Sequence, residues 1–281
     1  MDYIPKFYLD EVIRGTSHTL HPAFVVNGKE LDGIYVSKIQ NVVIDGRAHP
    51  LPGRDPAVHK EKGRGSMFTG FTPETVDFLW GIRMNNNRDW FLAHKQDYVN
   101  HLYEPMKALG KDLYGILSDR PGNLLKVSRI YRDARMHHPL PYKESLWICI
   151  RKDVDWWAQH PCLFFEIRPE KVSYGFFLWQ PTTAAMEAFR KHIGENPGEF
   201  LTLIRRTEKQ TGIPVTAETY KRPKIAPDAV LAPYFAWRGC IECTVEEEVS
   251  PALFGPALGQ RAAALLEKLI PLYEYFYRFT L

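Results

Sequence analysis

The sequence has few cysteines, little net charge and no long apolar run. Its 281 residues include four cysteines, and 36 lysine and arginine residues stand against 33 aspartate and glutamate residues. So few cysteines exclude a disulfide scaffold, and reduced thiols in a cytoplasmic protein are expected. A formal charge of +3 is too small to favour nucleic acid as a partner. No run approaches 18 uninterrupted apolar residues, so no membrane-spanning helix is expected.

Several functional motifs are also missing. The sequence contains neither of the glycine-rich phosphate loops GxxxxGK[ST] and GxGxxG, and it has no GxSxG nucleophile turn. These absences weaken the ATPase, dinucleotide-binding and α/β-hydrolase interpretations. The first residues lack the apolar core of a signal peptide. No cofactor is therefore assigned, and the question of enzymatic activity stays open.

What the sequence does contain divides unevenly near residue 66. All seven tryptophans and all four cysteines come later. Residues 59–66 have the composition of a linker, rich in charge and glycine. Before it, residues 1–58 contain short β-branched or aromatic runs at 24–26, 34–36 and 42–44, two of which are followed by Asn-Gly or Asp-Gly turns. We expect a short β-rich extension joined to a main domain at 67–281.

The main domain has the order helices, strands, helices. Thr72 can cap a first helix with Pro73 at its first position, and Pro105 should kink or restart the helical region that follows. Three runs with alternating apolar residues predict strands, the last two joined as a hairpin. Their residues are 146–151, 162–168 and 174–179. Helices are expected at 182–193, at 198–210 with an end at Thr211-Gly212, and at 256–279 with a break or bend at Pro271. A loop-rich stretch is expected at 213–250. This order predicts an α+β fold, an antiparallel sheet flanked by helices.

Four segments of the main domain resemble an uncharacterised family, domain of unknown function 2461. They are Phe68–Phe71, Asn86–Phe91, Arg129–Arg135 and Pro141–Lys143. The resemblance covers about three quarters of the chain and implies a bacterial or fungal relative and a fold, but no activity. The loop Met136–Leu140 departs from the family, because it lacks the usual charged run and is one residue shorter.

Residues 1–58 resemble a different group of proteins. The run from His21 to Val58 resembles the start of phage-associated C-type-lectin-fold proteins related to formylglycine-generating enzymes. The lectin core that follows in those proteins is missing. The resemblance implies a truncated or fused fragment, and it gives no ligand.

The densest group of candidate site residues follows Arg129. Several guanidinium groups close together suit bidentate recognition of phosphate or carboxylate. On a regular strand Arg129 and Arg132 point to opposite faces, so they converge only if a bulge intervenes. A structural ion-pair network is the alternative interpretation. The candidate ligand-binding residues are Arg129, Arg132, Asp133, Arg135, Tyr142, Lys143, Asn86 and Asn87.

Other motifs favour structural roles. Asn87 can cap the helix that follows it, although a helix N-terminus can also bind an anion. Adjacent His137 and His138 would face opposite ways, so no metal site is assigned. Cys240 and Cys243 form one CxxC without the second pair that zinc requires. Glu166 and Arg168 lie on one strand face and can pair.

The sequence thus supports two functions. The first is a domain that binds a small anionic ligand through the arginine-rich segment. The second is a protein-interaction module without catalysis, anchored by Trp156 and Trp157 because tryptophan is frequent at interface hot spots. Nucleic acid ranks third, and the sequence does not indicate an oligomeric state.

Overall fold

The structure is a computed structural model of the chain. It describes residues 67–117, 120, 122–132, 139–222 and 225–280, together with the backbone of four short strands nearer the N-terminus. These strands form two antiparallel pairs, β1 (Val25–Val26) with β2 (Lys29–Glu30) and β3 (Asn41–Ile44) with β4 (Arg47–Pro50).

Two of the strands predicted in the first segment coincide with β1 and β3. The third, at residues 34–36, and the linker at 59–66 lie outside the described residues. The boundaries of the β-rich extension therefore stay a prediction.

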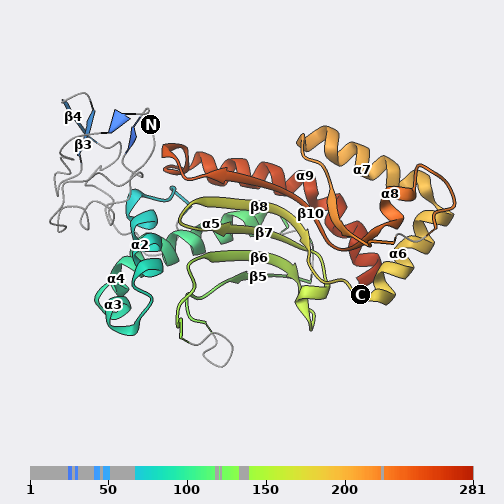
Figure 1. The fold of residues 1–281 in the computed structure, drawn as a ribbon, viewed down its shortest axis with the longest axis horizontal. Helices are drawn as coiled ribbons and strands as arrows, with labels where there is room; N and C mark the ends of the chain where they lie inside the picture. The colour runs from blue at the N-terminus through green and yellow to red at the C-terminus, as the bar shows by residue number, and fades with distance from the viewer. Residues whose placement is uncertain are drawn as a thin grey trace.

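A six-stranded antiparallel sheet forms the centre of the described fold (Figure 1). Its strand order is β5-β6-β7-β8-β10-β9, and every neighbouring pair is antiparallel. The strands are β5 (Asn123–Val127), β6 (Leu146–Lys152), β7 (Cys162–Ile167), β8 (Lys171–Leu178), β9 (Thr216–Thr219) and β10 (Trp237–Glu248). The three alternating runs of the sequence become β6, β7 and β8, and β7 and β8 form the expected hairpin. The prediction of an α+β fold with an antiparallel sheet is confirmed.

Helices precede, interrupt and follow the strands along the chain. They are α2 (Pro73–Met84), α3 (Arg88–Ala93), α4 (Lys95–Asp97), α5 (Glu104–Gly115), α6 (Thr183–Glu195), α7 (Pro197–Thr211), α8 (Ala232–Phe235) and α9 (Ala257–Thr280). A π-helical segment, η2 (Tyr98–Tyr103), joins α4 to α5, and short 3-10 turns lie at η3 (Trp157–Gln159) and η4 (Pro251–Leu253).

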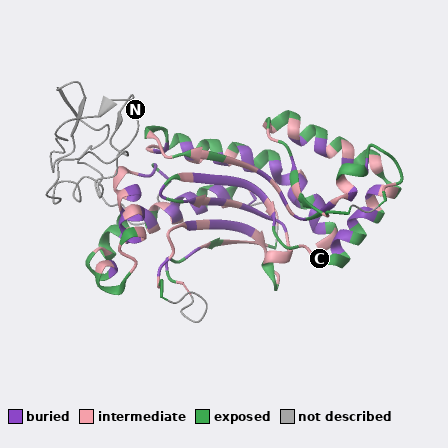
Figure 2. Cartoon of the chain, viewed as in Figure 1, coloured by how far each residue is buried: buried purple, intermediate pink, exposed green. Residues whose placement is uncertain are grey.

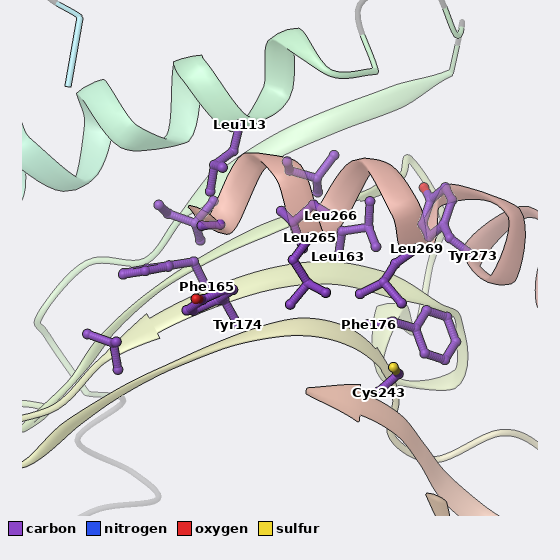
Figure 3. Close-up of a cluster of buried hydrophobic side chains, with 14 of the residues drawn as sticks. Leu113, Leu163, Phe165, Tyr174, Phe176, Cys243, Leu265, Leu266, Leu269 and Tyr273 are labelled. Carbon is purple, nitrogen blue, oxygen red and sulfur yellow. The ribbon is translucent and has the colours of Figure 1, made fainter. Parts of the chain in front are cut away.

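Helices α5 and α9 cover one face of the sheet. The first contacts β5 and β6, and the second contacts β7 and β8. Figure 3 shows Leu113 of α5 and Leu266 of α9 beside Leu163 and Phe165 of β7, in one continuous apolar cluster. Burying large apolar side chains contributes on the order of 1.5–3 kcal/mol each, so this layer is a main source of stability.

The opposite face of the sheet is less covered. Ile148, Phe165 and Phe176 on the helix side are fully buried, whereas Trp147 and Phe164 point the other way and are half-buried, as is Phe177. Figure 2 shows the fully buried residues gathered in the strands and on the helix surfaces against them. We call the side of the sheet defined by Trp147, Phe164 and Phe177 the open face.

Three local predictions about helix ends are confirmed. Thr72 is the N-cap of α2 with Pro73 next to it, and the Thr72 N–H donates to Thr75 Oγ1 at 3.1 Å. Pro105 lies in the first turn of α5, directly after η2 ends, so the helical region changes from π-helix to α-helix at this proline. Gly212 ends α7 with a left-handed φ of 72°.

One prediction for the last third of the chain is wrong, and a second is wrong in part. The stretch 213–250 is not loop-rich, because it holds β9 and the 12-residue β10. Its pattern is hidden by glutamates at one end and by register shifts near Gly239, where Cys240 has a φ of 49°. Of the break or bend predicted at Pro271, the break does not occur, because α9 continues through this residue. The apolar side of α9 is buried along its whole length, which offsets the single backbone hydrogen bond that proline removes.

Candidate anion-binding site

The segments that leave β5 and enter β6 continue to pair beyond the regular strands. Residues 128–132 and 141–147 are joined by backbone hydrogen bonds, and Tyr131 and Tyr142 form an antiparallel bridge. We call these two paired segments the ribbon. It extends one edge of the sheet and carries most of the described candidate residues.

The ribbon contains a two-residue register shift. Val127 pairs with Ile148 in the sheet, and Tyr131 pairs with Tyr142. Between these pairs one segment advances four residues and the other six. Extra residues in one strand bend it and change the direction of its side chains. Convergence of the basic side chains requires such a bulge, and the ribbon supplies it.

Asn86 and Asn87 both use their side chains to hold backbone. Asn86 Oδ1 accepts the Tyr142 N–H, and Asn86 Nδ2 donates to the Tyr142 carbonyl, each at 3.0 Å. Asn87 Oδ1 accepts the Trp90 N–H at 2.9 Å and so caps α3, as the sequence predicts. The two amides therefore support the site rather than face a ligand.

Aromatic packing fixes the ribbon from the same side. The ring of Phe91 on α3 stacks on Tyr142 with a centroid distance of 4.3 Å, and it meets Tyr131 edge-on at 5.6 Å. Tyr142 is buried, whereas Tyr131 is 52% exposed. Burial raises the pKa of the Tyr142 phenol, which stays protonated at neutral pH. Tyr142 is thus a packing residue of the ribbon.

Three cationic side chains of the ribbon and of β5 act on one another through their charges. Burial lowers the pKa of the Lys143 ammonium, and the positive charges of Arg132 and Lys126 lower it further. Lys143 Nζ donates to the Arg129 carbonyl at 2.9 Å and lies 5.5 Å from the centre of the Trp147 ring. We call Lys126, Arg132 and Lys143 the cationic cluster.

One described carboxylate lies close to this cluster, and it already has a stronger partner. Glu144 Oε2 accepts a hydrogen bond from Arg83 Nε at 2.7 Å, while its other oxygen is 4.0 Å from the Arg132 guanidinium. Arg132 Nε is buried and has no acceptor among the described residues. The cluster therefore has an excess of positive charge and unused hydrogen-bond donors.

The remaining arginine-segment residues fall into two groups. The Arg129 guanidinium acts on the phenol of Tyr98, where it opposes the rise in pKa that burial causes. The backbone carbonyl of Arg129, rather than its guanidinium, contacts Lys143 by accepting a hydrogen bond from the ammonium. Asp133 and Arg135 lie outside the described residues. Of the predicted residues, Arg132 and Lys143 are near enough for their charges to interact.

Lys126 was missed from the sequence. It is exposed on β5, opposite Cys149 of β6, and reaches the cluster because the two strands pair. The strand β5 itself was not predicted, since its five residues include only three apolar ones without regular alternation. The alternating apolar residues of β6 were the one sequence signal that a neighbouring strand such as β5 is present.

The other motifs have structural roles in the described residues. Arg168 donates to Glu166 at 2.8 Å, which confirms that pair. Burial raises the pKa of both Cys240 and Cys243, which is the reverse of what a reactive thiol needs. No group of His, Cys, Asp or Glu in the described part of the chain could hold a metal ion. His137 and His138 are not among the described residues.

Fold and site together define an α+β domain with a basic ribbon at one edge of an antiparallel sheet. The family described as "Conserved hypothetical protein (DUF2461)" matches residues 74–275, from the first turn of α2 to near the end of α9. The chain belongs to this family, as the four segments predicted. No curated protein matches the chain, and the resemblance of residues 1–58 to lectin-fold proteins is not confirmed. None of the described helices has both the length and the apolar composition needed to cross a membrane.

Proposed function

We propose that this domain binds a small anionic ligand that bears a phosphate or carboxylate group, at the cationic cluster. The observation that carries the proposal is the mutual charge interaction of Lys126, Arg132 and Lys143, whose one near carboxylate among the described residues, Glu144, is 4.0 Å from Arg132 and is hydrogen-bonded to Arg83 instead. Like charges held this close destabilise the empty site, and a bound anion reverses the sign of that interaction.

The donors suit such a ligand. The Arg132 guanidinium is planar and always charged, so it can hold two anionic oxygens at once. Lys143 adds a point charge whose stem is half-buried, and Lys126 adds one at the exposed side. Asn86 hydrogen-bonds the ribbon backbone at Tyr142, and Phe91 stacks on the Tyr142 ring. These contacts preorganise the cations before a ligand binds.

Isothermal titration of the full chain with inorganic phosphate tests the proposal. We expect Lys143→Ala to weaken binding about tenfold to a hundredfold, since a hydrogen bond to a charged group contributes about 1.5–3 kcal/mol. The matched control is Lys107→Ala. Lys107 also lies 5.5 Å from an aromatic ring, that of Tyr103, but it pairs with Glu104. Equal loss in both variants, or no binding by the wild type at millimolar phosphate, contradicts the proposal.

The pH dependence gives a second readout. Because burial and neighbouring cations lower the pKa of Lys143, its ammonium loses the proton at a lower pH than a free lysine. Anion binding should therefore weaken as pH rises, beginning below the ordinary lysine range. Lys143→Arg should move this loss to higher pH, because arginine stays charged. An unchanged alkaline limb in that variant would show that Lys143 does not contact the anion.

A second candidate function is protein interaction through Trp156. This side chain is 80% exposed, and its φ of 53° is a left-handed conformation that costs a tryptophan free energy. Trp157 beside it is 38% exposed. Trp156→Ala should leave stability nearly unchanged, and sedimentation velocity would reveal any assembly that this substitution dissolves. A wild-type chain that sediments as a monomer at all concentrations removes self-association from this candidate.

A further inference from the structure

We propose that the anion bound by the cationic cluster is carried on a planar ring, and that Trp147 is the surface on which this ring stacks. The inference rests on the anion-binding function proposed above. It adds the chemical class of the ligand, an aryl or nucleobase-bearing phosphate or carboxylate.

Trp147 is fixed at the cationic end of the open face. Its N–H donates to Ser128 Oγ at 2.9 Å, and its carbonyl accepts the Ser128 N–H at 2.8 Å. Its side chain points away from α5 and α9, and Lys143 Nζ lies 5.5 Å from its ring centre. A ligand whose charge meets Lys143 therefore has its remainder against or beside this indole.

The aromatic surface continues away from the cations. The Trp147 and Trp157 ring centres are 6.1 Å apart with planes inclined by 34°, and those of Trp157 and Trp179 are 6.5 Å apart at 37°. Trp157 and Trp179 are 38% and 46% exposed. The three indoles form a row of partly exposed rings that begins at the cationic cluster. Aromatic side chains in such a row stack flat rings and tolerate different ring types.

A role confined to supporting Lys143 does not account for this row. Five other cations among the described residues lie over aromatic rings: Arg83 over Trp80 at 5.0 Å, Lys107 over Tyr103 at 5.5 Å, Lys152 over Tyr277 at 4.6 Å, Arg190 over Tyr220 at 5.8 Å and Arg278 over Tyr275 at 4.9 Å. Arg83, Lys107 and Arg278 each have a carboxylate within 2.9 Å, whereas Lys152 lies over the buried Tyr277 and Arg190 is itself buried. The Lys143 pair differs, because like charges surround it and exposed indoles follow it. That combination of charge and apolar surface fits a ligand with an anionic end and a flat end.

Titration with matched esters tests the inference. Methyl phosphate and phenyl phosphate have the same charge and differ in the ring, so their affinity ratio for the wild-type chain isolates stacking. We expect phenyl phosphate to bind at least about fivefold tighter, given the usual contribution of aromatic stacking. Adenosine 5′-monophosphate, in a third titration, distinguishes a nucleobase from a simple aryl group.

Variants assign the preference to Trp147. Trp147→Leu should remove the preference for phenyl phosphate and leave methyl phosphate binding within about twofold of the wild type. Trp147→Phe should retain part of the preference, and it serves as the folded comparison if the leucine variant is unstable. The control, Trp80→Leu, removes a half-buried indole that also lies under a cation and should change neither affinity.

The outcomes separate the two proposals. Equal binding of methyl and phenyl phosphate overturns the stacking inference and leaves anion binding intact. A phenyl preference that persists in both Trp147 variants also overturns it, because the ring then lies elsewhere. Failure of every phosphate to bind overturns the proposed function, and the inference falls with it.

Discussion

Replacing Asn86 by alanine removes both hydrogen bonds that hold the Tyr142 backbone. The N–H and the carbonyl of Tyr142 each lie 3.0 Å from the Asn86 amide, and Tyr142 is buried against Phe91. Two average hydrogen bonds contribute about 1–3 kcal/mol together, and a buried backbone group left without a partner costs about 1–3 kcal/mol more. We therefore expect the free energy of unfolding to fall by about 2–6 kcal/mol.

The neighbouring Asn87 supplies the matched control. Its side chain makes one capping bond to the Trp90 N–H at the exposed start of α3. Loss of an N-cap costs about 1 kcal/mol, so Asn87→Ala should be the milder change although residue type and location are nearly the same.

Urea unfolding of the full chain, followed by circular dichroism, measures both variants. The Asn86→Ala midpoint should fall further than the Asn87→Ala midpoint, with similar slopes. Phosphate affinity should also drop in Asn86→Ala, because the ribbon backbone loses its anchor, and should hold in Asn87→Ala. Equal or smaller destabilisation in Asn86→Ala would refute the reasoning that these two bonds position the site.

Three further predictions concern the rest of the domain. Gly175 has a φ of 151°, and a Cβ at this residue would lie 2.2 Å from a carbonyl oxygen of β10. Gly175→Ala should therefore lower the free energy of unfolding, measured in urea, by about 2–4 kcal/mol. The control Gly115→Ala has open space around the new methyl group and should be neutral or stabilising. The Arg278 guanidinium holds the pKa of Glu199 below its usual range, so this ion pair stabilises the fold at neutral pH and loses that effect as pH falls. Arg278→Ala should lower the free energy of unfolding by up to about 1 kcal/mol at pH 7 and leave it unchanged in acid. A thiol reagent should modify Cys240 slowly in the native state and the three buried cysteines only on unfolding, and mass spectrometry of the labelled chain checks the order.

Local sequence signals predicted the parts of the fold whose causes are local. Thr72 and Pro73 mark the start of α2 because capping and a preset φ act within one turn. The alternation in 146–151 predicts β6 because one side of that strand faces the apolar layer under α5. These patterns need no knowledge of what lies across the sheet.

The parts that were missed depend on partners far away in the chain. β10 has glutamate at three successive positions, 246–248, which a local pattern assigns to a loop. It is a strand because β8 supplies continuous antiparallel partners along it. Lys126 likewise joins the cationic cluster only through pairing of β5 with β6, and the register shift of the ribbon has no local sequence signature.

The site is therefore a product of two modules that meet, rather than of the arginine-rich segment alone. Asn86 and Phe91 belong to the helical start of the domain, and their partner Tyr142 lies more than 50 residues later, on the ribbon. The cationic cluster gathers like charges, which on their own would move apart. The bulge and the arginine spacing do not by themselves fix the positions of these cations, since both leave the ribbon free to bend away from the helices. The two Asn86 hydrogen bonds and the Phe91 stack fix the ribbon in place, so substitutions of Asn86 or Phe91 should alter anion affinity without touching the ligand.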